Sequence, residues 1–366
     1  MSSRILASGI TLLSLCLADA TSAQGAVDLP KLLPFAVPTS PSLQFIGASP
    51  AKVERPSSGP EIFTSLLSAI DTAGRVQQGF ALDLAPAQFL WRNMDVDEYE
   101  SPGGFILANT TLSSGTARSS GDSSSTTIGF GVRTVFLDNA DPLSRAASAA
   151  GDAAIQQALT ACLPPGPVNR NDPVQVKNIR TCLQRADSTF RAEYRRLHWN
   201  DYSFAAGGAT GWGLKNSEWN EREWLGFAVW AVGAAPLCFR VAPRGVCNRG
   251  QWVAQIHHER RDSTFDGPGR NRTALGVRGN WGSGRFNLFA EGLQLWTHDA
   301  PSGVDDSYNE WSGGLEFRVT DELWVATGFG SRFNDATRDS EVAVIANLRF
   351  NVAPTRMLQK IVPGAP

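Results

Sequence analysis

The sequence predicts an all-β fold: an antiparallel β-barrel of about twelve strands, with an N-terminal helix-containing extension and a helical-hairpin insertion. Segments of about ten residues alternate small or apolar residues with polar ones, and very short turns separate them. The chain also holds 35 glycines and 11 tryptophans. In one such segment Leu315, Phe317 and Val319 point one way. Glu316 and Arg318 point the other way, so the predicted sheet has one apolar and one polar face.

The strand pattern occupies residues 76–351 and is interrupted by the insertion at residues 139–199. The first segment begins at Gly79, and the others are Phe105–Ser114, Thr126–Leu137, Tyr202–Gly211, Trp224–Ala235, Gln251–Arg261, Thr273–Trp281, Arg285–Trp296, Tyr308–Thr320, Leu323–Arg332 and Glu341–Phe350. These make eleven. A closed barrel with both ends on one side of a membrane needs an even number of strands, so we expect a twelfth.

Residues 1–23 have the composition of a signal peptide for export. Arg4 supplies a positive charge, and Ile5–Ala18 form an apolar stretch that is too short to span a bilayer. Ala18-Asp19-Ala20 or Thr21-Ser22-Ala23 then provides a small-residue cleavage site. No later run reaches about eighteen apolar residues, so we expect no transmembrane helix.

Residues 24–75 form a proline-rich extension, which we expect to be extended and unpacked up to about Ala51. A helix signature follows, with Ser58 as the cap, Pro60 in the first turn and an apolar stripe ending at Ile70. Four placements of this helix stay open: it plugs the barrel, covers one end, lies against the membrane, or packs as an amphipathic helix without a further role. Residues 352–366 form a C-terminal tail.

The insertion is predicted to be a hairpin of two helices. They open with Asp141-Pro142 and Asp172-Pro173, where aspartate can cap the helix and proline fits its first turn. The second helix carries an apolar stripe along Ile179–Leu197. We expect this stripe to dock on the barrel, and the alternative is a protein partner.

Four cysteines remain after removal of the signal peptide, and an even number in an exported chain indicates disulfides. Their spacing favours the pairs Cys162–Cys182 and Cys238–Cys247. A metal site is the alternative, but the spacings match no zinc pattern. We therefore expect no metal and no cofactor.

Several features favour a transmembrane barrel over a soluble β-sandwich. Strands of about ten residues suit a tilted crossing of the bilayer. Tryptophans near strand ends suit the two membrane interfaces: Trp224, Trp252, Trp281, Trp296, Trp311 and Trp324. The opposite face collects charged and polar residues, which we expect to line the lumen: Asp83, Arg133, His257, Glu259, Arg278, Glu291, Glu316, Arg318 and Arg349. A soluble sandwich would place these groups in water and should be richer in lysine and threonine.

The signal peptide, proline-rich leader, glycine-rich alternating strands and final aromatic strand together resemble the outer-membrane β-barrel proteins of Gram-negative bacteria. The resemblance covers Gly79–Phe350 and is one of architecture, without a diagnostic motif. It implies a location in the outer membrane, contact with outer-membrane lipid, and insertion by the barrel assembly machinery. One departure is that many such proteins end in phenylalanine, whereas Asn351–Pro366 follow Phe350 here.

The sequence gives few indications of a bound ligand or a catalysed reaction. The net charge of −2 gives no sign of a surface for nucleic acid. The acidic stretch Trp91–Gly104 is expected to be a solvated loop, because it lacks the ligand order of a calcium-binding loop. His257 precedes Glu259 by two residues on the same face, as a general base with an orienting carboxylate would, but a structural role is the alternative. No nucleophile is placed to complete a catalytic set.

The sequence therefore favours a passive channel or transport-associated pore. The alternative is a structural or interaction barrel that binds a periplasmic or surface protein through its helical insertion. An outer-membrane hydrolase based on His257 comes third, so an enzymatic role is not the expectation.

Overall fold

The computed structural model describes residues 36–48, 53–54, 61, 65, 76–90, 94, 96–118, 125–143, 157, 160–163, 172–237, 249–264, 269–283, 285–299, 304–319, 323–334 and 339–350. All of them belong to the compact unit Leu33–Pro366. The predicted signal peptide, most of the helix predicted after Ser58, the Cys238–Cys247 pair and the tail 352–366 lie outside the described residues.

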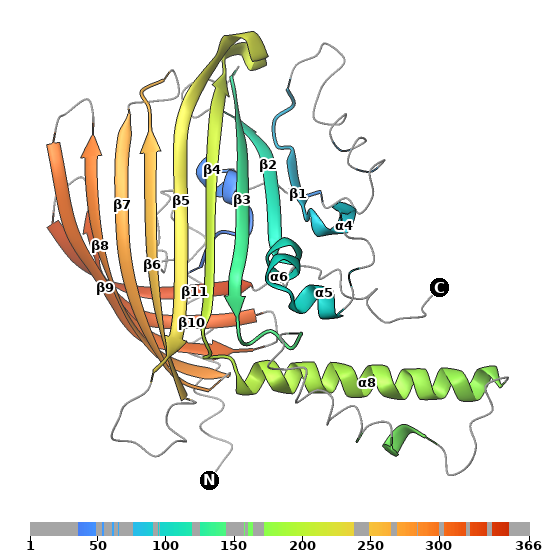
Figure 1. The fold of residues 1–366 in the computed structure, drawn as a ribbon. Helices are drawn as coiled ribbons and strands as arrows, with labels where there is room; N and C mark the ends of the chain where they lie inside the picture. Colours follow the sequence, from blue (N-terminus) through green and yellow to red (C-terminus); the bar gives the residue numbers. More distant parts are fainter. Residues whose placement is uncertain are drawn as a thin grey trace, which may run out of the picture. The chain divides into compact units, whose positions relative to one another are not determined.

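Eleven antiparallel strands form one sheet, in which every strand pairs with its neighbours in chain order (Figure 1). They are β1 (Ala81–Leu84), β2 (Thr110–Arg118), β3 (Thr126–Asp138), β4 (Ser203–Leu214), β5 (Arg222–Pro236), β6 (Gly250–Arg261), β7 (Arg270–Gly282), β8 (Phe286–Asp299), β9 (Val304–Arg318), β10 (Leu323–Asn334) and β11 (Asp339–Phe350). The all-β antiparallel prediction is thus confirmed. Within the described residues β1 and β11 do not pair, so the sheet is not closed into a barrel there, and no twelfth strand is present.

One predicted strand is wrong in its first half. Residues Pro102–Ala108 form helix α6, and β2 begins only at Thr110. The Ser101 hydroxyl caps α6 by accepting a hydrogen bond from Gly104 N at 3.1 Å, and Pro102 occupies the first turn. The acidic stretch before it is not an open loop either, because it holds helix α5 (Val96–Glu100).

Helix α5 is fixed to the sheet by Tyr99. This side chain is buried, and its hydroxyl donates to Asp141 Oδ2 at 2.5 Å and accepts from Asn109 Nδ2 at 3.1 Å. Its ring packs edge-on against Phe105 of α6. Three shorter elements complete the connections: α4 (Ala87–Leu90), η2 (Lys215–Ser217) and η3 (Trp219–Glu221).

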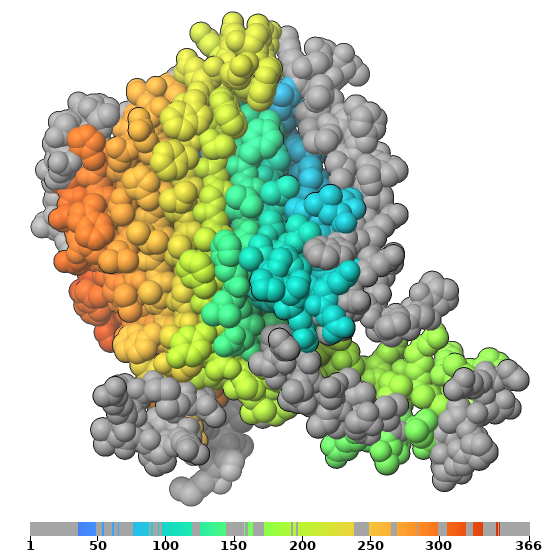
Figure 2. Space-filling view, viewed as in Figure 1, coloured from blue at the N-terminus to red at the C-terminus, as the bar shows by residue number. Residues whose placement is uncertain are grey.

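Large apolar side chains are exposed across one whole face of the sheet, here called the outer face. The strand register puts them on the same side, since Trp281 pairs with Leu288 and Leu288 with Leu315. The set includes Phe130, Val132, Phe204, Trp224, Val229, Trp252, Ile256, Leu275, Val277, Trp281, Phe286, Leu288, Trp296, Trp311, Leu315, Phe317, Phe329, Val342 and Val344. In Figure 2 strands β3 to β8 form a continuous part of this surface.

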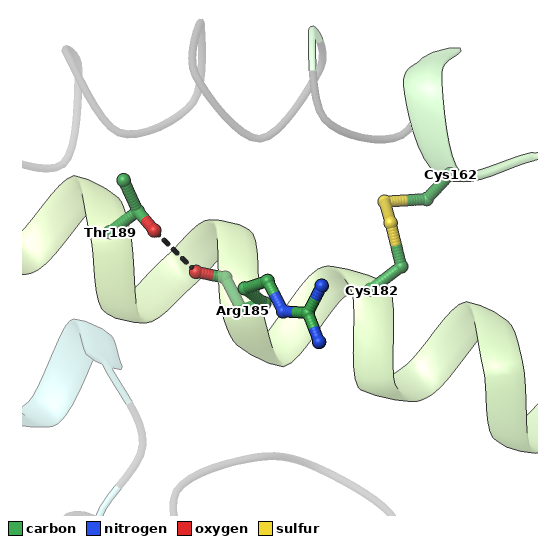
Figure 3. Close-up of a disulfide and its surroundings, with 4 residues drawn as sticks. All are labelled: Cys162, Cys182, Arg185 and Thr189. Carbon is green, nitrogen blue, oxygen red and sulfur yellow. Dashed lines mark hydrogen bonds between the residues drawn. A yellow bond between two sulfur atoms is a disulfide. The ribbon is translucent and has the colours of Figure 1, made fainter.

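Helix α8 (Pro173–Leu197) is the longest helix among the described residues, with 25 residues. Asp172 caps it as predicted, accepting hydrogen bonds from Val174 N at 2.9 Å and Gln175 N at 3.3 Å. The predicted disulfide between Cys162 and Cys182 links it to the preceding segment, with the two Cα atoms 5.8 Å apart (Figure 3). Most of the first helix of the predicted hairpin lies outside the described residues.

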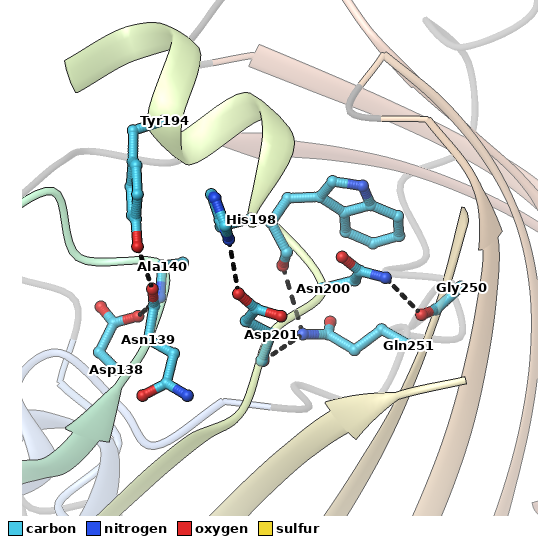
Figure 4. Close-up of polar contacts among 10 residues, drawn as sticks. Asp138, Asn139, Ala140, Tyr194, His198, Asn200, Asp201, Gly250 and Gln251 are labelled. Atoms are coloured by element: carbon cyan, nitrogen blue, oxygen red, sulfur yellow. Dashed lines mark hydrogen bonds and ion pairs between the residues drawn. The ribbon is translucent and has the colours of Figure 1, made fainter. Parts of the chain in front are cut away.

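The contacts of α8 with the sheet are concentrated in its last turns (Figure 4). Tyr194 is buried, and its hydroxyl donates to Asn139 O at 3.4 Å. Just beyond the helix, His198 stacks on the Tyr194 ring and bonds Asp201 at 2.7 Å. Asn200 Nδ2 donates to Gly250 O at 2.9 Å, which ties the end of α8 to the start of β6. The expectation that the apolar stripe docks on the barrel therefore holds only at its C-terminal end.

In the part of the chain that the structure describes, no helix has both the length and the apolar character needed to cross a membrane.

Candidate functional site: the inner face of the sheet

The face opposite the outer face, here called the inner face, is occupied by a segment of the N-terminal extension. Residues Ala36–Ala48, the inner segment, contain helix α2 (Pro41–Phe45), which contacts β2, β3 and β4. Figure 1 shows α2 behind these strands. Its Ser42 and Phe45 are 0% and 1% exposed. The expectation of an unpacked leader up to Ala51 is therefore wrong for these residues.

Glycines in β2, β3 and β4 make room for the inner segment. A Cβ added at Gly131 would lie 2.6 Å from Ser42 N, and one at Gly129 would lie 2.9 Å from Ser42 O. Both distances are too short for real contacts, and backbone atoms cannot swing aside. Gly115, Gly207 and Gly211 similarly face Leu43, Val37 and Phe45. The glycines thus leave space on the inner face for the inner segment, and a larger side chain at these positions would occupy that space.

Apolar packing holds the inner segment near both of its ends. Phe45 and Val37 belong to a buried cluster with Ala209, Leu225, Ala228 and Trp230. Arg261 of β6 adds a second contact, since its guanidinium lies 5.0 Å from the Phe45 ring centre and donates to the Phe45 carbonyl. Because Arg261 also pairs with Glu259 at 2.5 Å, its side chain is held in place.

Polar hydrogen bonds hold the middle of the inner segment. The Ser40 hydroxyl donates to Asp83, with both carboxylate oxygens 2.8 Å away. Ser42 N donates to the Ser113 hydroxyl at 3.1 Å. Asp83 was predicted to face the lumen, and it does lie on the inner face, opposite Ser113 in the register. Its side chain is buried beneath the inner segment.

A second polar group on the inner face centres on Arg278 of β7. Its guanidinium lies 2.5 Å from Glu316 and 3.3 Å from Glu291, so one cation pairs with two carboxylates. Arg278 Nε donates to Asn280 Oδ1 at 2.8 Å, and the Ser312 hydroxyl donates to Glu291 at 2.5 Å. All five side chains are buried. Buried charges are tolerated when they are paired and hydrogen-bonded as these are.

His257 lies between these two groups, next to an aromatic ring and a carboxylate. Its ring stacks on Trp230 with centres 5.1 Å apart, and Nε2 lies 3.8 Å from Glu259. Within the described residues His257 Nε2 has no hydrogen-bond partner. No described serine, threonine or cysteine is therefore bonded to this nitrogen as a nucleophile would be to its base.

The remaining predicted lumen residues also map to the inner face. Arg133 pairs with Gly207 in the register, beside the inner segment. Arg318 pairs with Trp324, and Trp324 with Arg349, so all three positions share the face of Glu316. The register thus gives the position of Trp324 to the inner face, whereas the sequence predicts it at a membrane interface.

Two features of the inner face were missed from the sequence. Arg261 follows His257 and Glu259 in the same alternation, so the period of two could have identified it. The inner segment gave a weaker signal: glycines recur two positions apart in β3 (Gly129, Gly131) and in β4 (Gly211, Gly213), which indicates a close approach of another part of the chain.

Among the residues described, no cluster of histidine, cysteine, aspartate or glutamate could hold a metal ion. No protein-family model matches the chain, and no curated protein matches it either.

Proposed function

We propose that the protein is an integral outer-membrane β-barrel that forms a passive pore, and that the inner segment closes this pore at rest. The observation that carries the proposal is the outer face, where large apolar side chains remain exposed across neighbouring strands. Phe329 is 56% and Val344 is 78% exposed. A contiguous apolar surface of this kind is unusual on a soluble monomer, and it marks a membrane or protein contact.

The distribution of side chains along the outer face favours lipid as the contact. Val229 and Val277 lie near the middle of their strands, whereas Trp281 and Trp296 lie near strand ends. Aromatic residues at the ends and aliphatic residues between them suit a bilayer with two interfaces. Burying each large apolar side chain contributes about 1.5–3 kcal/mol, so the whole face strongly favours insertion.

Insertion requires that the sheet close. Backbone groups at a free strand edge cost several kcal/mol each in lipid, because no water is present to bond them. Closure between the β1 side and β11 is therefore part of the proposal, and it makes the inner face a lumen.

The contents of this lumen support a closed pore. Charges of both signs line it, and they pair with one another in the Arg278 group and at Arg261–Glu259. The inner segment occupies the side formed by β2 to β4. A solute would pass along the polar face once the inner segment moves, and Arg261 is the residue whose loss should release it.

Two measurements test the proposal. The first compares gel mobility of the detergent-extracted protein with and without boiling, since a closed membrane barrel changes its mobility on heating. The second measures conductance in planar bilayers for the native chain, for Arg261→Ala, and for the control Arg260→Ala on the outer face. We expect low conductance for the native chain and control, and frequent openings for Arg261→Ala. A water-soluble protein without a mobility shift would overturn the membrane assignment.

A structural or interaction barrel is the second candidate. It is supported by α8, which runs away from the sheet (Figure 1). Its polar residues Lys177, Asn178 and Arg180 are exposed. An inserted protein that conducts in none of the three forms would favour this candidate over the pore.

A further inference from the structure

Positive charge is concentrated in α8, although the chain as a whole has a net charge of −2. The helix contains six basic residues and two acidic ones. The acidic Asp187 is already paired with Arg191, four residues on, at 2.9 Å. The helix therefore carries a net charge of +4 from its side chains.

Three of them stand on the exposed side of α8. Lys177, Arg180 and Arg185 are exposed, whereas Ile179, Leu183 and Phe190 on the opposite side are half-buried. Within the described residues these three cations make no side-chain hydrogen bond or ion pair. Figure 3 shows the Arg185 carbonyl, which accepts from the Thr189 hydroxyl, and no dashed line joins the Arg185 guanidinium to the other residues drawn. An exposed cationic surface is thus left for an anionic partner.

The position of α8 indicates which partner it meets. Its C-terminal turns are fixed where β3 ends and where β4 and β6 begin, and from there it runs across the strand direction and away from the sheet (Figure 1). Twenty-five residues of α-helix extend about 37 Å. In a membrane-inserted barrel, a helix leaving the strand ends in this direction lies over the surrounding lipid and not over the lumen.

Exposed aromatic side chains mark the level of the interface at the same place. Tyr202, between α8 and β4, is 54% exposed, and Phe204 and Phe136 pack together on the outer face next to it. Leu197, the last residue of α8, is also exposed. Tyrosine beside apolar residues is typical of the boundary between headgroups and acyl chains.

We infer that α8 binds the phosphate groups of anionic phospholipids through Lys177, Arg180 and Arg185, and so anchors the rim of the barrel to the membrane surface. This inference rests on the proposed membrane insertion. Juxtamembrane basic residues attract anionic headgroups, and the attraction is screened by salt. An acidic protein is the competing occupant, but the direction of α8 over the lipid favours the headgroups.

The test places the full-length protein in lipid nanodiscs of phosphatidylcholine, with and without phosphatidylglycerol, and follows amide hydrogen exchange over Pro173–Leu197. We expect exchange to slow when phosphatidylglycerol is present, and the effect to disappear at high salt. In Lys177→Gln/Arg180→Gln/Arg185→Gln the protection should fall by up to about a hundredfold. The matched control Asn178→Gln/Thr181→Ser/Ser188→Thr changes the same exposed surface without changing charge, and it should keep the protection.

Each outcome decides between the two proposals. A protein that shows the heat-dependent mobility shift in both nanodiscs but the same α8 exchange in each would overturn the lipid-anchor inference alone. Protection that requires added periplasmic protein instead of phosphatidylglycerol would replace the lipid by an acidic protein. A chain that does not enter nanodiscs would overturn the membrane assignment and the anchor together.

Discussion

Arg278 and Glu316 form an ion pair across an intervening strand. The first lies on β7 and the second on β9, yet Arg278 Nη2 is 2.5 Å from Glu316 Oε1. The guanidinium reaches over β8, where Glu291 pairs directly with Arg278 in the register. The Phe289 ring lies 4.4 Å from the same guanidinium and helps to hold it over β8. Three strands are thus joined by one buried cation.

Replacement of Arg278 by methionine should strongly destabilise the sheet. Glu291 and Glu316 would stay buried without their cation, and breaking a buried pair in this way costs about 3–5 kcal/mol. Urea unfolding of the lipid-inserted protein, followed by tryptophan fluorescence, measures the change. The exposed Arg285→Met is the control and should cost no more than about 0.5 kcal/mol. Equal losses in the two variants would show that the ion-pair group does not stabilise the fold.

A larger side chain at Gly131 should displace the inner segment. The Cβ of Gly131→Val would lie 2.6 Å from Ser42 N, a backbone atom that can move only with the whole of α2. We expect faster proteolysis within Ala36–Ala48 and frequent opening in planar bilayers. Gly292→Val is the control, because nothing lies within 4 Å of a Cβ there. A Gly131→Val protein with native proteolysis and conductance would contradict the closing role of the inner segment.

The alternation of side chains predicted the two faces of the sheet well, because assigning one residue of a strand to a face fixes the face of every other residue in that strand. Once Leu315 was assigned to the apolar face, Glu316 had to lie on the other. The short turn after Gly282 also fixes the register, so that Arg278 meets Glu291. The contact between Arg278 and Glu316 depends on the twist of three strands and on the reach of the arginine side chain. The order of residues along the chain gives neither of these.

Local patterns failed where distant residues decide the structure. Phe105, Ile106 and Leu107 form an apolar run without a period, and the cap at Ser101 makes it a helix instead of a strand. The prolines before Ser42 predicted an extended leader. Burial of that segment depends on glycines between 72 (Leu43 to Gly115) and 170 (Val37 to Gly207) positions further along the chain.

Ser40 and Asp83 should be energetically coupled, because their hydrogen bond joins the inner segment to β1. A bond from a hydroxyl to a carboxylate contributes about 1.5–3 kcal/mol. A double-mutant cycle with Ser40→Ala and Asp83→Asn measures the coupling through the urea stability of the four proteins. We expect the double variant to be more stable than the sum of the single losses predicts. Additive losses would mean that the bond contributes nothing.

Removal of the Cys162–Cys182 disulfide should loosen the insertion without opening the barrel. The bond closes a loop over a sequence separation of 20, and constraint of such a loop in the unfolded state is worth about 3 kcal/mol. Cys182 lies in the third turn of α8, far from the anchor at Tyr194, so Cys162→Ser/Cys182→Ser should speed hydrogen exchange in the N-terminal half of α8. Exchange in β7 and β8 should stay native, as should the mobility shift on heating. A variant that lost the shift would show that the insertion helps to hold the sheet together.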